Sequence, residues 1–117
     1  MDRPQPSNIV HVWMPLYIGD YLRDTIGLTN SQHGSYLLSM MAYWSKGESL
    51  TNAELRTAAG RDFHFIVKFY ILVDNRWHHK RLDIELSKAR ANALHMKAIA
   101  AKSVAKRRAS GLLPPPT

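Results

Sequence analysis

The fold of this protein is decided by residues 51–80, which read TNAELRTAAGRDFHFIVKFYILVDNRWHHK. The stretch opens with the pattern T-x-x-E, formed by Thr51 and Glu54, in which each side chain accepts a hydrogen bond from an otherwise unpaired backbone N–H. Such a capping box marks the start of a helix, and a glycine marks its end. We therefore expect a short helix over residues 52–59 that stops at Gly60.

A second short helix and a β-hairpin are expected after the glycine. The helix is predicted over residues 62–69, close enough to the first for the two to form a helix-turn-helix candidate. The chain then becomes β-like at residues 70–73, a run of aromatic and branched apolar side chains. Residues 74–75, Asp-Asn, tolerate positive φ and predict a two-residue turn, after which residues 76–80 return as the partner strand.

A longer helix is predicted upstream, over residues 31–46. Thr29 or Ser31 caps its start, and Gly47 suits the left-handed residue just beyond its end. One broad face of this helix is expected in the core: His33, Tyr36, Leu37, Met40, Met41, Tyr43 and Trp44. Three helices followed by a hairpin is the order of a winged helix. The fold class predicted for residues 9–82 is therefore mainly α with a small β-hairpin, a winged helix-turn-helix.

The segments before and after these helices and the hairpin differ from them in composition. Residues 1–8 hold two prolines among polar residues and are expected to form a flexible arm. A short strand or helical turn is the expectation for residues 13–22, because a proline and a glycine break any long element. An Ala/Lys/Arg-rich basic helix is predicted over residues 83–110, followed by a disordered tail over residues 111–117.

Composition excludes several classes of protein. The chain has 117 residues, 45 % of them hydrophobic, and no cysteine. That length allows one small domain with a real core, and the missing thiols exclude disulfides and thiol-based metal sites. No apolar run approaches the roughly 20 residues of a membrane span, and the amino terminus lacks the apolar stretch of a secretory signal. We expect a cytoplasmic protein without membrane contact, associated with the nucleoid if it binds DNA.

The charge of the chain is concentrated at one end. The formal net charge is +7. Residues 1–75 hold six Lys/Arg and seven Asp/Glu, a net charge of −1, whereas residues 76–108 hold ten and two, a net charge of +8. A cationic end on a nearly neutral body is typical of a protein whose partner has a phosphate backbone. The alternative is a solubilising tail without a partner.

Several stretches resemble the YdaU-like family of phage and prophage proteins, a domain of unknown function. They are WMPLYIGDYLRDT at residues 13–25, HGSYLL at 33–38, AYW at 42–44 and NRWHHKRLD at 75–83. The resemblance covers about residues 12–90. It implies a fold similar to the winged-helix amino-terminal domains of phage replication-initiation proteins, and by analogy DNA handling.

The second helix of the helix-turn-helix provides the first candidate DNA-binding residues. Arg61, His64 and Lys68 are spaced three and four apart and share the face opposite the expected core. An ordinary solvated face is the alternative. Between Gly60 and Phe69 the chain is a few residues shorter than the family pattern, which is expected to limit sequence reading by this helix.

The predicted hairpin provides a second group. Strand alternation places Arg76, His78 and Lys80 on one side, outward, if Trp77 packs into the core. Phosphate contact is their expected role, and protection of an edge strand is the alternative.

The basic helix provides the third and largest group: Lys88, Arg90, Lys97, Lys102, Lys106, Arg107 and Arg108. No acidic residue follows Glu85, so a helix ordered on DNA would add sequence-independent affinity. The opposite side of the helix carries an apolar stripe of Leu82, Leu86, Ala89, Ala93, Met96, Ala100 and Val104. Pairing of this stripe with a second copy would give a weak homodimer, because alanine makes a poor coiled-coil seam.

Metal binding and catalysis are not expected. His78 and His79 point to opposite faces of a strand, and no H-x-x-x-H spacing occurs. His33 is expected to be a hydrogen-bonded histidine of the apolar face. Asp20 and Asp24 are expected to cap a helix or to pair with arginine, Arg23 or Arg81. Without a phosphate loop or a nucleophile motif, we expect neither an enzyme nor a cofactor.

The leading hypothesis is a small winged-helix DNA-binding protein of phage or prophage origin, acting in replication initiation or gene regulation through largely electrostatic contacts. Duplex DNA is expected rather than single-stranded DNA. The alternative is a protein-interaction module that inhibits or recruits a host or phage factor, which an exposed Phe65 on the short helix would favour.

Overall fold

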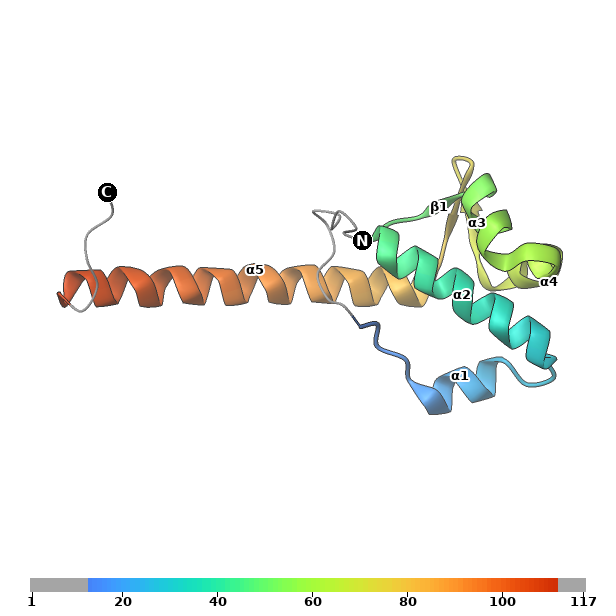
Figure 1. Ribbon diagram of the computed structural model, residues 1–117, viewed down its shortest axis with the longest axis horizontal. Coiled ribbons are helices and arrows are strands. Elements are labelled where there is room, and N and C mark those ends of the chain that lie inside the picture. The colour runs from blue at the N-terminus through green and yellow to red at the C-terminus, as the bar shows by residue number, and fades with distance from the viewer. Residues whose placement is uncertain (1–12, 112–117) are drawn as a thin grey trace, which may run out of the picture.

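The computed structural model describes residues 13–111, which form a small body and one long projecting helix (Figure 1). The elements are, in order, α1 (Ile18–Asp24), α2 (Asn30–Lys46), β1 (Leu50–Thr51), α3 (Asn52–Ala59), the 3-10 turn η1 (Gly60–Asp62), α4 (Phe63–Ile66), the 3-10 turn η2 (Val67–Phe69), β2 (Ile71–Val73), β3 (Arg76–His78) and α5 (Lys80–Ala109). The expected arm over residues 1–8, and the expected tail beyond residue 111, lie outside the described residues.

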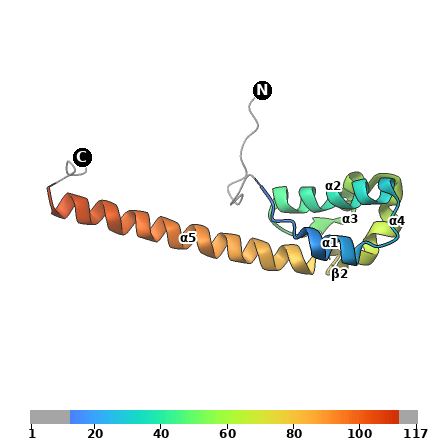
Figure 2. The ribbon, with the colours of Figure 1, turned by 90° about the horizontal axis from the view of Figure 1, so that it is seen from below.

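The architecture is mainly helical, with a three-stranded antiparallel sheet and a long carboxy-terminal helix. This confirms the coarse fold class predicted from the sequence. The described chain extends over 61 × 32 × 31 Å, and α5 accounts for the longest dimension (Figure 1). Seen from the perpendicular direction, α1, α2, α3, α4 and β2 gather at one end of α5, and the rest of α5 projects away (Figure 2).

Helix α2 forms where the sequence predicted it, one residue longer at its start. The Thr29 hydroxyl accepts the Gln32 N–H at 3.1 Å, the Gln32 amide oxygen accepts the Thr29 N–H at 2.9 Å, and Gly47 ends the helix at φ 80°. The expectation that Met41 is buried was wrong, since its exposed fraction is 52 %. It lies about 100° around the helix from the buried Met40, on the solvent side.

Helix α3 has the predicted bounds, whereas the helix expected over residues 62–69 is interrupted. Thr51 and Glu54 form the capping box, and Lys46, which donates to Glu54 at 2.6 Å, lowers the pKa of that carboxyl to about 2. Beyond Gly60 only α4, four residues long, is α-helical between two 3-10 turns. Phe63 and Ile66 of α4 are buried in the core. The helical conformation ends with η2, and the backbone is extended at Tyr70.

The predicted hairpin is present, and a third strand joins it. Asp74 and Asn75 form the turn at φ 51° and 63°. β2 pairs with β3, and β3 also pairs with β1, so β3 is the central strand. The sequence did not show β1, because two residues are too few for a recognisable pattern. The partner strand ends at His78, so the expectation that it continues to Lys80 was wrong.

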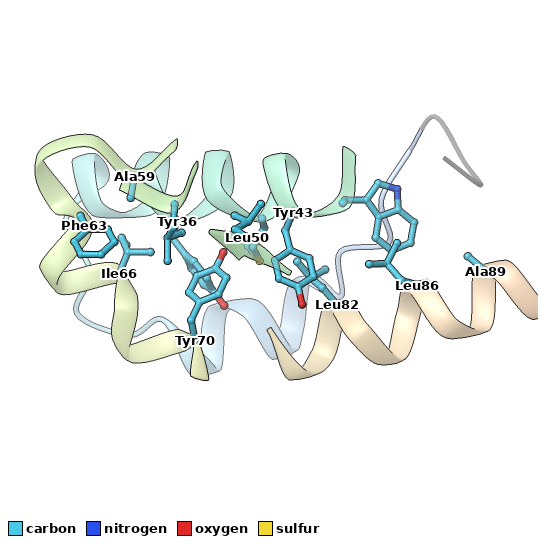
Figure 3. Close-up of a cluster of buried hydrophobic side chains, with 13 residues drawn as sticks. Tyr36, Tyr43, Leu50, Ala59, Phe63, Ile66, Tyr70, Leu82, Leu86 and Ala89 are labelled. Atoms are coloured by element: carbon cyan, nitrogen blue, oxygen red, sulfur yellow. The ribbon is translucent and has the colours of Figure 1, made fainter. Parts of the chain in front are cut away.

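The core lies between α2, α3, α4 and the first turns of α5 (Figure 3). Tyr43 and Ile66 are fully buried, and α5 contributes Leu82 and Leu86, whose exposed fractions are 3 % and 2 %. Ala89 is the last buried residue of α5. Alanine is the best helix former, which is why α5 remains helical for five more turns without packing against the body.

Candidate nucleic-acid interface

The first predicted group, on the second helix of the predicted helix-turn-helix, is exposed but is not part of one regular helix. Arg61 lies in η1, His64 in α4 and Lys68 in η2. The Lys68 ammonium lies 3.9 Å from the centre of the Phe65 ring, a cation–π contact. Phe65 is half-buried beneath it. The expectation that Phe65 is exposed, which favoured a protein partner, was therefore wrong.

An acidic side chain accompanies Arg61 at this surface. Asp62 accepts hydrogen bonds from the Ser35 hydroxyl at 2.7 Å and from the Ser31 hydroxyl at 2.9 Å. These bonds lower the pKa of the Asp62 carboxyl and keep it ionised. They also tie η1 to the first turns of α2. The negative charge of Asp62 offsets part of the positive potential that Arg61 supplies. The surface formed by Arg61, His64 and Lys68 therefore attracts phosphate only weakly.

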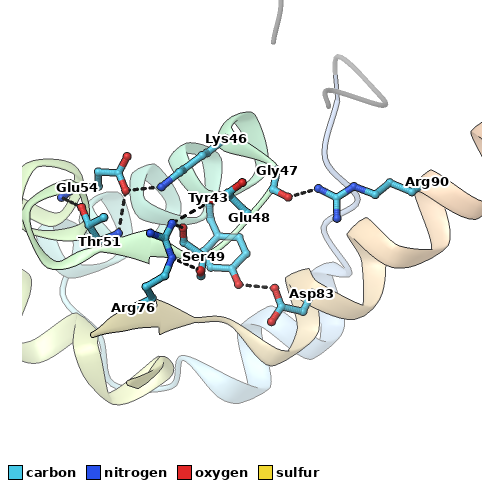
Figure 4. Close-up of polar contacts among 10 residues, drawn as sticks. All are labelled: Tyr43, Lys46, Gly47, Glu48, Ser49, Thr51, Glu54, Arg76, Asp83 and Arg90. Carbon is cyan, nitrogen blue, oxygen red and sulfur yellow. Dashed lines mark hydrogen bonds and ion pairs between the residues drawn. The ribbon is translucent and has the colours of Figure 1, made fainter. Parts of the chain in front are cut away.

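Within the second group, Arg76 is held inside the protein framework (Figure 4). Its Nε–H donates to the Ser49 hydroxyl at 2.7 Å, and its Nη2 donates to the Ser49 carbonyl at 2.7 Å and to Glu48 at 3.1 Å. This guanidinium therefore fastens β3 to the loop between α2 and β1. It has few donors left for a phosphate.

The other two members of that group also differ from the prediction. His78 lies 3.4 Å from the Asp83 carboxylate, atom Nδ1 to Oδ2. Lys80 is the first residue of α5, so strand alternation does not place it beside the other two. Edge-strand protection was wrong for β3 because this strand is central. The outer strands are β1 and β2, and the residues Ile71–Val73 of β2 are apolar and exposed.

The third group divides into a structural part and a free part. Near the body, the Lys88 ammonium lies 3.7 Å from Glu85, and the Arg90 guanidinium donates to the Gly47 carbonyl at the end of α2 (Figure 4). Arg90 therefore links α5 to the carboxy-terminal end of α2. The distal half of α5, which we define as residues 91–109, begins immediately after it.

The distal half of α5 carries the free cations. Within residues 13–111 none of these side chains makes an ion pair: Lys97, Lys102, Lys106, Arg107 and Arg108. All of them are exposed. Met96, at 56 %, and Ala100 of the predicted apolar stripe are exposed as well, whereas Ala93 and Val104 are partly buried. The five cationic side chains, all beyond the last acidic residue of the chain, therefore stay candidates for phosphate contact.

A buried polar cluster that the sequence did not reveal anchors α5 to the body. His79, with an exposed fraction of 7 %, accepts the Leu82 N–H on Nδ1 at 3.2 Å and so caps α5. Its Nε2–H donates to the Tyr36 hydroxyl at 2.8 Å. This cap starts α5 three residues before the predicted residue 83. The sequence held one signal for the burial of His79: strand alternation places it on the same side as Trp77, which was expected in the core.

The environment of this cluster fixes its protonation states. Burial lowers the pKa of His79 to about 4, and burial raises the pKa of Tyr36 well above its usual range. The Tyr43 hydroxyl accepts the His79 backbone N–H at 3.1 Å and donates to Asp83. The neutral imidazole therefore joins α2 to the first turn of α5.

The remaining polar expectations near α1 are confirmed. The Tyr21 hydroxyl and His33 Nδ1 are hydrogen-bonded at 2.8 Å. Asp20 lies 3.5 Å from Arg23 and 3.2 Å from Arg81.

Among residues 13–111, no group of three or more His, Cys, Asp and Glu side chains is placed to hold a metal ion. No helix in the same range is both long and apolar enough to cross a membrane.

Comparison with known proteins identifies the family. Residues 12–87 match the family model described as "Protein of unknown function (DUF1376)". The chain belongs to the DUF1376 family. It is also 32 % identical over 103 residues to the uncharacterized protein YdaU of Escherichia coli (strain K12), which supports the family resemblance read from the sequence. That match covers 82 % of this chain and 36 % of YdaU, so the chain spans about a third of the relative's length. No solved structure matches it significantly.

Proposed function

We propose that this DUF1376 protein is a small DNA-binding protein of phage or prophage origin, in which a winged helix-turn-helix body carries a cationic helix. It acts in replication initiation or in gene regulation. The observation that carries the proposal is the set of five exposed cations on the distal half of α5 that make no ion pair with any residue from 13 to 111. Each cation that contacts a phosphate releases a condensed counterion, which gives affinity without sequence preference.

The order of the elements supports the winged-helix part of the proposal. A helix, a short strand, two helices and a hairpin follow one another, and β1 completes the sheet by pairing with β3. α3 and α4 are joined by a turn at Gly60, whose φ is 60°. In this proposal the body orients α5, while α4, with only four α-helical residues, adds little reading of base sequence.

The test is a binding titration of the full chain with labelled random-sequence DNA, followed by fluorescence anisotropy. Phosphate contact by four or five of these cations predicts that affinity falls at least about a hundredfold between about 50 and 200 mM salt. The double variant K102A/K106A is compared with R61A/K68A, because each removes two exposed charges. We expect the α5 pair to lose more affinity and to reduce the salt dependence more.

Two results would count against this function. Absence of DNA binding at the lower salt concentration would overturn it entirely. Equal losses in the two double variants would show that the body and α5 contribute equally to the contact, against the leading role given to α5.

A protein-interaction module is the second candidate, favoured by exposed apolar surface on the body. The three residues of β2 are 48–56 % exposed on the free edge of the sheet. A groove of about 770 Å³ between α2 and α3 is lined mostly by small and apolar side chains, among them Leu38, Ala42 and Ala53. Exposed apolar patches of this kind suit a protein partner better than phosphate. This function predicts that I71S/V73S abolishes capture of a partner from host extract without changing DNA affinity.

A further inference from the structure

The free cations of α5 form two rows along the helix. At about 100° per residue, Lys97 and Arg108 lie within about 20° of each other, and we name them the first row. Lys102 and Lys106 lie within about 40° of each other and form the second row. The two rows are about 150° apart around the helix axis. A helix that merely carried charge for solubility would need no such division.

The two sides of the helix between the rows differ. Between Lys97 and Arg108 the shorter arc holds Ala98, Ala101 and Ala105, all exposed, and we name this surface the alanine face; Leu94, 69 % exposed, lies on the same side nearer the body. The longer arc carries Met96 and Arg107, which are bulkier, and it continues the side that packs on the body near Leu86. The cations therefore flank a slim surface, and Arg107 points away from it.

We infer that residues 97–108 of α5 lie in the major groove of duplex DNA, with the alanine face toward the base edges and one cationic row against each phosphate backbone. The inference rests on the proposed DNA-binding function and adds the form of the nucleic acid and the docking geometry. Charge complementarity selects the partner, because two lines of cations match two lines of phosphates. The residues of the shorter arc let the helix backbone approach the bases closely.

The dimensions agree with this placement. α5 has 30 residues, so it is about 45 Å long at 1.5 Å per residue. The major groove of B-form DNA is about 12 Å wide and admits an α-helix. A duplex of RNA has a deep, narrow major groove that side chains do not reach, and a single strand offers only one line of phosphates. Duplex DNA is therefore the form that uses both rows.

The decisive comparison is between two neighbouring arginines of identical chemistry. R108A removes a charge from the first row, whereas R107A removes one from the opposite side of the helix. In the groove, R108A weakens binding to a DNA duplex about fivefold and lowers the salt slope by about one, while R107A changes neither. Equal losses in R107A and R108A would overturn the groove placement and leave electrostatic DNA binding intact.

A second pair tests the alanine face without changing the charge. A98L adds bulk between the two rows, and A100L adds the same bulk on the longer arc. Both positions are exposed, so both variants keep the fold. We expect A98L to weaken duplex binding and A100L to leave it unchanged. The same loss in both variants would contradict the inferred orientation.

The polymer itself separates failure of the inference from failure of the proposed function. The full chain is titrated with a DNA duplex, an RNA duplex of the same sequence and the DNA single strand, at one salt concentration. Tighter binding to the DNA duplex by about tenfold or more supports the groove placement. Equal binding to all three overturns the placement but not DNA binding, and binding to none overturns both.

Discussion

His79 Nε2 and the Tyr36 hydroxyl lie 2.8 Å apart, in a buried hydrogen bond that joins the first turn of α5 to the middle of α2. The other ring nitrogen of His79 caps α5 by accepting the Leu82 N–H. Both nitrogens are thus used by the neutral ring, one as donor and one as acceptor. A second proton on the imidazole would break the cap, so the attachment of the cationic helix depends on a histidine that stays neutral.

Stability is therefore predicted to fall as the solution is acidified. The pKa of His79 is about 4 in the folded protein, against 6.5 ordinarily. Between pH 6.5 and 4 the imidazole is therefore protonated in the unfolded chain but not in the folded protein. The free energy of unfolding should decline between pH 6.5 and 4 by about 3 kcal/mol. Urea unfolding across this range measures it. H79N keeps a capping oxygen but cannot titrate, and a decline as steep in H79N would exclude His79 as the cause.

Removal of the Tyr36 hydroxyl should destabilise the body. Y36F leaves the Nε2–H of His79 buried without an acceptor, at a cost of about 1–3 kcal/mol. Y21F is the matched control, because the Tyr21 hydroxyl also meets a histidine, His33, but in a partly exposed position. Chemical denaturation of the two variants compares them, and a Y21F loss equal to that of Y36F would argue against the importance of burial.

The two halves of α5 should respond differently to truncated side chains. L86A removes a side chain that is 2 % exposed and should cost about 2–5 kcal/mol. M96A acts on a side chain that is 56 % exposed, and its effect should remain within about 0.5 kcal/mol. Thermal unfolding distinguishes the two. A large loss in M96A would reveal that the distal half packs against something, such as a second copy.

Arg76 should behave as a structural residue. R76A removes three hydrogen bonds to Glu48 and Ser49 and should lower the free energy of unfolding by about 1–3 kcal/mol. R76K should recover little of this, because an ammonium cannot reproduce the planar fork of the guanidinium. DNA affinity of folded R76A should fall less than that of K102A. The reverse order would return Arg76 to the phosphate-binding surface.

Local signals in the sequence determined helices α2 and α3 with their ends, and the hairpin turn. The capping boxes at Thr29 and Thr51 act within four residues, and Gly47 and the turn at Asp74 and Asn75 meet backbone requirements at single positions. Hydrogen bonds of such short range form in the same way whatever surrounds them. The run of cations without acidic neighbours after Glu85 is also a property of the sequence alone.

Only the tertiary structure decided which of the basic residues are free. Ser49 and Arg76 are 27 positions apart, and Gly47 and Arg90 are 43 apart, so no local pattern could show that these arginines are engaged in the framework. Strand β1 exists because Leu50 meets Trp77, and His79 became a buried cap because α2 brings Tyr36 to it. The residues that pair are distant in the chain, and packing against a shared core brings them within hydrogen-bonding reach.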